Sequence, residues 1–425
     1  MSVRAGIVVT GTEVLSGRVT DRNGPWVSER LGELGVEVAQ IICVADRPDD
    51  LRSALEFCRD AGVDLIVTTG GLGPTADDLT AEVVAAFAER PMELDEGMEK
   101  RIAAIIEGFA KRYKFDPEGL AAGTRKQAMV PVGATALDPA GTAPGLVVPA
   151  GSATVIVLPG PPRELQTIWP AAIAVEDIQT VLAGAESYET ATMKMFGIPE
   201  STLAKSLREI EAEADLEALE ITTCLRRGSE LEIDVRYRAA DAAANESLFA
   251  GLRARHGAFI YTETGEALDE LLAALLRGRT IAAAESCTAG MFASRLADTP
   301  GSSEYLRGGV VAYSDQAKTD LLGIDAELIA AHGAVSAEVA AAMAAGARER
   351  FGAEIGIGIT GVAGPGGGSE EKPVGFVCVC VADDAGNELA RQVVMPGSRN
   401  DIRERTVGAG MHMLRRLLLG QNLPI

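Results

Sequence analysis

The sequence predicts an α/β protein with two three-layer α/β/α domains joined by a small α+β module. Short apolar runs of strand length alternate with longer amphipathic segments at both ends of the chain, as in mostly parallel sheets covered on both faces. The length of 425 residues exceeds one ordinary core and favours two or three domains. Hydrophobic residues make up 47% of the chain and charged residues 24%, which is the composition of a globular protein.

In residues 1–172, strand-like and helix-like segments alternate. The helices begin with Pro25 or with Asp residues, which favour a first helical turn. The expected strands are Gly6–Thr10, Glu37–Val44, Leu65–Thr69 and Ala153–Leu158, and the expected helices are Gly24–Leu34, Asp49–Ala61, one from about Leu79, and Glu93–Tyr113.

Two further domains are expected after residue 172. Residues 173–262 are richer in charge, and the alternating strand Leu231–Arg238 before the helix Asp241–Arg255 predicts a small α+β module. Residues 263–425 return to the α/β pattern, with Ser336 capping one helix. The expected strands here are Thr280–Ala284, Gly309–Tyr313, Glu354–Thr360, Val374–Ala382 and Leu389–Met395, and the main helices are Leu268–Leu276, Ala337–Phe351 and about Asp401–Leu419.

Composition limits the partners and the compartment. The chain carries 61 acidic and 39 basic residues, a net charge of −22, so we expect no nucleic-acid partner, although local pockets for small phosphates stay open. Apolar runs fall short of the roughly 20 residues that cross a bilayer, and the N-terminus lacks a signal-peptide pattern. We therefore expect a cytoplasmic protein without membrane contact. The six cysteines form no C-x-x-C pair, so neither a disulfide framework nor a structural zinc site is expected.

A candidate nucleophile lies in the segment Glu285–Gly290, between a buried strand and a helix. That position exposes a side chain at the carboxyl edge of a parallel sheet, where ligands bind. The Ser286 hydroxyl could attack a carbonyl while free amides of the helix start hold the oxyanion. The alternative is that Ser286 or Thr288 only caps the helix, a common role of these residue types.

A candidate base follows the next strand. Tyr313 ends that strand and Lys318 lies in the first turn of the next helix, where a cation opposes the helix dipole. Desolvation can lower a lysine pKa from about 10.4 toward neutrality, so that the amine accepts a serine proton. The alternative is an ordinary surface lysine.

Two further segments are typical of phosphate and ligand contacts. Residues 358–368 contain six glycines in eleven positions, which lets backbone amides approach a ligand closely. Arg399 and Arg403 lie four residues apart at the start of the final helix, a pattern that suits a phosphate monoester. A flexible turn and ordinary surface arginines are the alternatives.

Five ordered motifs in residues 267–420 resemble the nicotinamide-nucleotide amidohydrolase domain. This resemblance implies hydrolysis of nicotinamide mononucleotide to nicotinate mononucleotide and ammonia without a cofactor. The motifs are Ala284–Thr288, Gly309–Ser314 with Ala317-Lys318, His332–Ser336, Gly361–Pro365 and Glu371–Gly375.

The resemblance also implies site residues. Ser286 matches the nucleophile, and Lys318 and Tyr313 match the groups that activate it. Cys287 is a rival nucleophile without an evident His partner, and Ala289 stands where the family usually has Gly, just inside the expected helix, where Ala should be tolerated. The expected substrate-binding residues are Thr288, Thr360, Gly361, Gly364, Arg399 and Arg403.

Motifs within residues 3–170 resemble the molybdopterin-binding-like domain that heads CinA (competence/damage-inducible) proteins. This resemblance implies ADP-ribose pyrophosphatase activity and a homodimer, although Gly123–Arg125 departs from the family pattern before Lys126. The motifs are Thr10–Gly17, Asp21–Asn23, Thr69–Asp78, Lys126–Ala128 and Leu158–Pro162. The expected nucleotide contacts are Glu13, Asn23, Gly70, Gly71, Gly73, Thr75, Lys126 and Gly160.

The adjacent carboxylates of Asp77 and Asp78 are candidate ligands for a divalent cation of the Mg, Mn or Co type. Such a cation would bridge to phosphate oxygens held by the glycine loop. The alternative is that the two residues are only charges at a helix N-terminus.

The leading hypothesis is therefore a deamidase of pyridine-nucleotide salvage with a second, ADP-ribose-cleaving domain. A non-catalytic pterin- or nucleotide-binding regulatory protein linked to competence is the alternative class, and a protein active only in its N-terminal domain is the third. The intact set of Ser286, Tyr313 and Lys318 favours catalysis.

Overall fold

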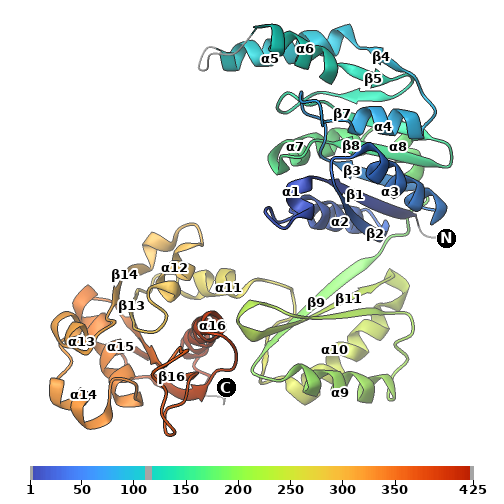
Figure 1. The fold of residues 1–425 in the computed structure, drawn as a ribbon. Coiled ribbons are helices and arrows are strands. Elements are labelled where there is room, and N and C mark those ends of the chain that lie inside the picture. The colour runs from blue at the N-terminus through green and yellow to red at the C-terminus, as the bar shows by residue number, and fades with distance from the viewer. Residues whose placement is uncertain (1–2, 111–116, 422–425) are drawn as a thin grey trace. The chain divides into compact units, whose positions relative to one another are not determined.

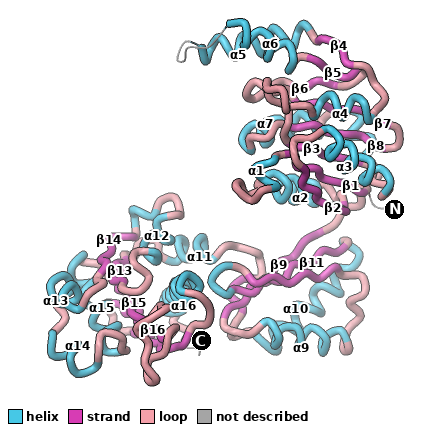
Figure 2. The backbone as a smooth tube through the Cα atoms, in the orientation of Figure 1, coloured by secondary structure: helices cyan, strands magenta, loops and turns pink. Residues whose placement is uncertain are grey.

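The computed structural model describes residues 3–110 and 117–421, and the chain divides into two compact units, Met1–Tyr188 and Glu189–Ile425. Strands and helices alternate along each unit, and helices flank the sheets (Figures 1 and 2). The predicted α/β class is confirmed. The domain boundaries at residues 172 and 262 stay predictions, because the second unit contains both a small sheet and a larger one.

The first unit is built on a six-stranded sheet with the order β2-β1-β3-β8-β7-β6. Its first four strands are parallel and were expected, whereas β7 and β6 are antiparallel additions that the sequence did not predict. The strands are β1 Arg4–Thr10, β2 Glu37–Val44, β3 Leu65–Thr69, β6 Thr135–Leu137, β7 Gly145–Ala150 and β8 Ala153–Leu158, and a separate antiparallel pair joins β4 Met92–Leu94 to β5 Met129–Pro131.

Helices cover both faces of this sheet because alternate strand residues point to opposite sides. Ile7 and Val9 belong to the core beneath α2, α7 and α8, whereas Val8 belongs to the core beneath α3 and α4. The predicted helix Glu93–Tyr113 begins at Glu96, and its residues 111–113 lie outside the described residues. The helices are α1 Thr12–Leu15, α2 Asn23–Glu33, α3 Pro48–Asp60, α4 Thr80–Phe87, α5 Glu96–Ala110, α6 Pro117–Gln127, α7 Pro162–Ile173 and α8 Glu176–Leu182.

The second unit begins with a four-stranded antiparallel sheet of order β10-β11-β9-β12. Helices α9 and α10 pack on this sheet through Leu203, Ile210 and Leu248. The elements are β9 Glu189–Phe196, α9 Glu200–Glu211, β10 Glu220–Leu225, β11 Glu230–Tyr237, α10 Ala242–His256 and β12 Ile260–Thr262.

The larger sheet of the second unit has the order β14-β13-β15-β16-β17. Its first three strands are parallel, and β16 and β17 are antiparallel additions. The strands are β13 Ile281–Glu285, β14 Leu306–Val311, β15 Ile355–Gly361, β16 Phe376–Asp383 and β17 Glu388–Val394.

The helices of this part form the two outer layers. Ile281 and Ala283 belong to the core with α11, α12 and α16, while Ala282 and Ala284 belong to the core with α13, α14 and α15. Ser336 caps α15 by accepting from the Val339 amide, as the sequence predicts. The helices are α11 Leu268–Leu275, α12 Met291–Ala297, α13 Asp315–Leu322, α14 Ala326–His332, α15 Ala337–Phe351 and α16 Arg399–Leu418.

Helix α16 also contacts the small sheet. The His412 ring is fully buried, stacks on Phe196 with ring centroids 3.9 Å apart, and meets Tyr261 edge-on at 4.9 Å. Burial lowers the pKa of His412 to about 4, so this side chain is neutral at pH 7. The C-terminal half of α16 is therefore fixed by both sheets of the second unit.

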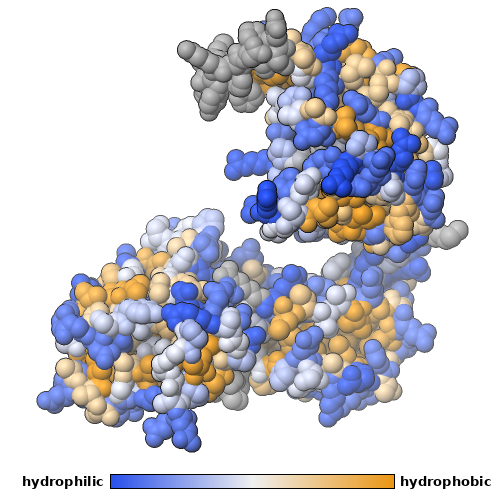
Figure 3. Space-filling view, in the orientation of Figure 1, coloured by the Kyte–Doolittle hydropathy of each residue, from blue (hydrophilic) through white to orange (hydrophobic). Residues whose placement is uncertain are grey.

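Polar and charged side chains cover much of the visible face of each unit, with smaller hydrophobic areas between them (Figure 3). This agrees with a chain of 61 acidic and 39 basic residues. Among the described helices, none combines the length and the apolar character that a membrane span requires.

Strand β15 lies against α15 without intervening side chains. A Cβ atom at Gly358 would lie 2.0 Å from the Ala340 oxygen and 2.6 Å from the Ala344 nitrogen. Only glycine permits this approach. The close approach places β15, which ends at the glycine-rich loop, directly against α15.

We expect the substitution Gly358→Ala to lower the free energy of unfolding by about 1–3 kcal/mol or more, because the added methyl group must displace helix backbone. Denaturant unfolding measures this. Gly366→Ala is the matched control, because its Cβ would meet nothing within 4 Å. Equal stability of the two variants would contradict this description of the layer contact.

Candidate functional site

The Ser286 turn lies at the carboxyl edge of the larger sheet, between β13 and α12. The Ser286 amide donates to the Ile359 oxygen of β15 at 2.8 Å, and the Ala312 amide beyond β14 donates to the Glu285 oxygen at 2.9 Å. Ser286 is 9% exposed. Three parallel strands therefore fix the backbone at the candidate nucleophile.

Neither Ser286 nor Thr288 caps α12, so the capping alternative is wrong. Gly290 is the N-cap residue of α12, and no side chain at this position accepts a hydrogen bond from the helix amides. The buried carboxylate of Glu285 instead accepts from the amides of Gly290, Phe292 and Ala293 at 3.0, 3.0 and 2.9 Å. These three amides are therefore occupied and do not serve an oxyanion, contrary to our expectation for the helix start.

Lys318 is not a surface lysine. It lies in the first turn of α13, as predicted, but only 2% of its surface is exposed. Burial lowers the pKa of its ammonium group below the usual range, although Asp315 at 3.7 Å and the Cys287 thiol act in the opposite direction. The structure thus supplies an amine that loses its proton more easily than an exposed lysine does.

Tyr313 and Arg399 meet at the same edge of the sheet. Tyr313, which follows β14, is 55% exposed. The Arg399 guanidinium, at the start of α16, donates to the Tyr313 hydroxyl at 2.7 Å and to the Gly364 oxygen at 2.5 Å. One arginine therefore joins the tyrosine, the glycine-rich loop and α16.

Arg403, one turn further along α16, contacts the Ser286 turn directly. Its Nε donates to the Cys287 oxygen and its Nη2 to the Thr288 oxygen, both at 3.0 Å. The predicted pair of arginines thus lies at the site, with Arg403 bound to backbone carbonyl groups.

Several expected substrate contacts are buried. Thr360 is 1% exposed and donates its hydroxyl to the Ala334 oxygen at 2.8 Å. Thr288 is fully buried, and its hydroxyl has no hydrogen-bond partner among the described residues. In their present rotamers both threonines lie behind the site. Gly364 is buried while Gly361 is partly exposed.

Cys287 is a poor rival to the serine. Its thiol is buried against Gly361, and burial raises the pKa of Cys287 to about 12. The thiolate is the nucleophilic form, so Cys287 is unreactive in this environment.

Ala289 lies outside α12, contrary to the expected position just inside a helix. It occupies the turn before Gly290 with φ of 51°, a left-handed conformation that costs a non-glycine residue roughly 1–2 kcal/mol. The methyl group is tolerated at the price of backbone strain.

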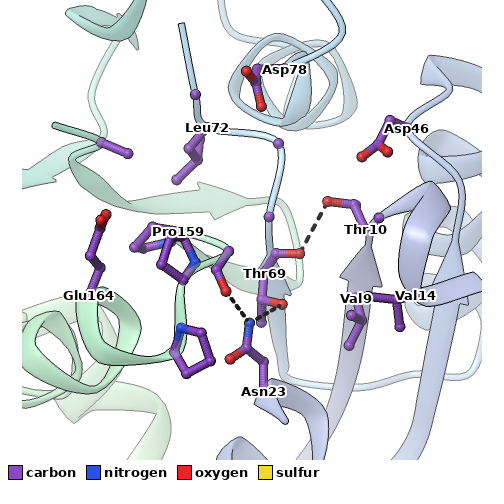
Figure 4. Close-up of a pocket in the computed structure, with 18 of the residues that line it drawn as sticks. Val9, Thr10, Val14, Asn23, Asp46, Thr69, Leu72, Asp78, Pro159 and Glu164 are labelled. Carbon is purple, nitrogen blue, oxygen red and sulfur yellow. Dashed lines mark hydrogen bonds between the residues drawn. The ribbon is translucent and has the colours of Figure 1, made fainter. Parts of the chain in front are cut away.

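A second candidate site is a cavity of about 740 Å³ in the first unit (Figure 4). It opens at the carboxyl ends of β1, β3 and β8. Of the predicted nucleotide contacts, Thr75 and Lys126 do not line it. Those that do are Glu13, Asn23, Gly70, Gly71, Gly73 and Gly160, together with both candidate metal ligands.

Two contacts shape the floor of this cavity. The Asn23 side-chain amide donates to the Gly160 oxygen at 2.8 Å and to the Thr69 hydroxyl at 3.3 Å, which joins the start of α2, the end of β3 and the loop after β8 (Figure 4). Gly70 has φ of 99°, and a Cβ there would lie 2.5 Å from the Thr10 oxygen. The glycine is therefore required by both conformation and space.

Thr75 connects the two candidate metal ligands. Its hydroxyl lies 2.5 Å from an Asp77 oxygen and 2.6 Å from an Asp78 oxygen and shares its one proton between them, and the Lys126 ammonium donates to the Thr75 backbone oxygen. The hydrogen bond from Thr75 lowers the pKa of Asp77. Both carboxylates line the cavity ahead of α4, and neither lies within that helix.

The cavity is strongly acidic. Arg22 is the cation among its lining residues. No three His, Cys, Asp or Glu side chains form a metal-binding group within residues 3–110 and 117–421. The carboxylates in the lining are Glu13, Asp21, Asp46, Asp77, Asp78 and Glu164.

Comparison with known proteins finds family models that match the two ends of the chain. A family model described as "CinA C-terminal domain" matches residues 265–418, and one described as "Probable molybdopterin binding domain" matches residues 6–177. A "CinA-like protein" of Mycolicibacterium gilvum is 58% identical over 99% of this chain and 100% of its own length. The chain belongs to the CinA family.

A second curated relative agrees, and a solved structure matches part of the chain. A "CinA-like protein" of Mycobacterium tuberculosis is 55% identical over 99% of this chain and 98% of its own. The solved competence/damage inducible protein of Agrobacterium tumefaciens is 38% identical, covering 35% of this chain and 94% of its own, with a TM-score of 0.34.

Sequence reasoning missed the role of Glu285. A signal was present, because a carboxylate directly after the apolar run Ile281–Ala284 is buried at a strand end and must find partners. Its partners are amides of the next helix, which no spacing rule identifies.

We expect Lys318→Met to raise the free energy of unfolding at pH 7 by about 1–4 kcal/mol, because a buried charge is replaced by an apolar chain of similar length. Since folding lowers the pKa of Lys318, the unfolded chain binds more protons, and wild-type stability rises with pH toward 10.5. The difference between the two proteins should therefore shrink as the pH rises.

Denaturant unfolding between pH 7 and 10 measures this difference. Lys205→Met is the control, because the Lys205 side chain is 73% exposed. A gap between wild type and Lys318→Met that does not change with pH would contradict the lowered pKa.

Proposed function

We propose that the second unit hydrolyses the carboxamide of nicotinamide mononucleotide to nicotinate mononucleotide and ammonia. The observation that carries this proposal is the buried Lys318, whose pKa is lowered, in the helix that follows the strand beside the Ser286 turn. A desolvated amine is a proton acceptor suited to activating a serine hydroxyl.

In the proposed reaction the uncharged Lys318 amine takes the Ser286 proton while the serine oxygen bonds to the carboxamide carbon. Collapse of the tetrahedral intermediate breaks the C–N bond, and the leaving nitrogen receives a proton through the Tyr313 hydroxyl. Water then cleaves the acyl-enzyme, returning the serine proton. Because Glu285 occupies the amides at the start of α12, amides of the glycine-rich loop remain as the candidates that stabilise the oxyanion.

Arg399 supports a nucleotide substrate. It supplies positive charge at the mouth of the site, next to the exposed Tyr313 and the glycine-rich loop. A phosphate monoester could accept hydrogen bonds there from the guanidinium group.

We expect Ser286→Ala and Lys318→Arg each to lower ammonia release by at least about 1,000-fold. The first variant lacks the nucleophile, and the second carries a cation that does not lose its proton near neutral pH. Wild-type kcat/KM should rise with pH through the pKa of Lys318 and then level off. A coupled ammonia assay on nicotinamide mononucleotide measures both, and Ser294→Ala on α12 is a control expected to retain activity. Ser286→Ala turnover near wild type would overturn the assignment.

We further propose that the first unit cleaves the diphosphate of ADP-ribose with a divalent cation. The support is an acidic cavity at the strand ends that contains a glycine-rich loop and both Asp77 and Asp78. These carboxylates fit a hard cation, whose charge would offset the repulsion between the acidic lining and a diphosphate. Because the described residues form no complete ligand set, phosphate oxygens and water would complete the coordination.

We expect Asp78→Ala to lower metal-dependent release of adenosine monophosphate from ADP-ribose by at least about 100-fold and to weaken Mn²⁺ binding, because a carboxylate ligand is lost. Product analysis and calorimetry with Mn²⁺ measure the two effects. Asp60→Ala, on the exposed end of α3, is the control. Nucleotide binding without cleavage in the wild type would favour the regulatory alternative instead.

A further inference from the structure

The Ser286 turn is held by charged side chains on both of its sides. Glu285 precedes the serine, and its carboxylate accepts hydrogen bonds from the backbone amides that follow the turn, at Gly290, Phe292 and Ala293. Arg403 approaches from α16 and donates to the oxygens of Cys287 and Thr288. The backbone on either side of Ala289 is thereby fixed by charged side chains in addition to the strand contacts at Ser286.

Helix α16 provides a rigid support for Arg403. Ser398 and Asp401 form a capping box at its start, and most of its C-terminal half is buried, including His412 between Phe196 and Tyr261. The guanidinium therefore comes from an element anchored by both sheets of the second unit, and a shift of α16 would shift the turn.

Arg403 and Arg399 have different partners. The Nε and Nη2 edge of Arg403 donates to two carbonyl groups of the Ser286 turn, whereas the two Nη atoms of Arg399 donate to Gly364 and Tyr313. Arg399 has no contact with the turn among the described residues and lies beside the exposed Tyr313.

We infer that Glu285 and Arg403 are positioning residues that hold the Ser286 turn in its reactive geometry. This inference rests on the proposed deamidase and assigns Arg403 to the nucleophile rather than to the substrate phosphate. A displacement of about 1 Å at a reacting atom can cost about 100-fold in rate, which is the effect that loss of either residue should have.

The first test separates positioning from phosphate binding. Arg403→Gln is assayed for ammonia release from nicotinamide mononucleotide and from nicotinamide riboside, which lacks the phosphate. A positioning role predicts that kcat falls about 100-fold while KM stays within about threefold of wild type. The loss of kcat should be equal with both substrates, and added guanidinium should partly restore activity. A raised KM for the mononucleotide alone would overturn the inference and favour phosphate binding.

The second test does not depend on deamidase activity. Cys287 lies within the turn and is 4% exposed, so its alkylation rate, measured over a range of pH to separate exposure from thiol ionisation, reports whether the turn is closed. In a background with Cys43→Ser and Cys224→Ser, we expect Glu285→Gln and Arg403→Gln each to speed alkylation of Cys287 at least tenfold, as measured by peptide mass spectrometry. Arg405→Gln, also on α16, is the matched control and should leave the rate unchanged.

The outcomes distinguish the two hypotheses. Faster alkylation in a protein whose wild type releases no ammonia would sustain the structural role and reject the deamidase. Unchanged alkylation in both variants would reject the positioning role whatever the activity. If Arg403→Gln does not fold, Arg403→Lys serves instead, because an ammonium group keeps the charge but cannot reproduce the planar fork.

Discussion

The contact on which the second unit's site depends is the one between the Glu285 carboxylate and the amides at the start of α12. A buried carboxylate is stable only when hydrogen bonds replace its lost water, and the unpaired amides of a helix start supply them. Because Glu285 is also the last residue of β13, its hydrogen bonds to the helix amides fix the angle between β13 and α12. Ser286 and its neighbours occupy the connection and have little freedom of their own.

Under the two proposed functions, the candidate sites would balance the charge of an anionic nucleotide in opposite ways. In the second unit the positive charge beside the glycine-rich loop comes from a side chain, Arg399. In the first unit the lining carries several carboxylates against Arg22, so a diphosphate is repelled unless a cation accompanies it. The two sites therefore differ in local charge, a difference that the net charge of −22 for the whole chain does not reveal.

Periodicity predicted the parallel strands, most helices and the cap at Ser336, because these depend on neighbours a few residues apart. It missed the strands β4, β5, β6, β7, β9, β10 and β12. In β7, Gly145 and Pro149 flank a short apolar run and resemble a loop. No sequence pattern predicted that Lys318 is buried. We expected its burial only because a lysine must be desolvated to act as a base. The partners of Arg403 could not be predicted at all, since they lie 115 and 116 residues away and depend on how closely α16 approaches β13.

Unfavourable features accumulate at the carboxyl edge of the larger sheet. Lys318 loses solvation, Ala289 adopts a left-handed conformation, and the buried Thr288 hydroxyl lacks a partner among the described residues. Each costs on the order of 1–3 kcal/mol, and none contributes to the hydrophobic core. The close packing of β15 on α15 can offset these costs. Unfavourable features that concentrate at one sheet edge are typical of a site selected for chemistry rather than for stability.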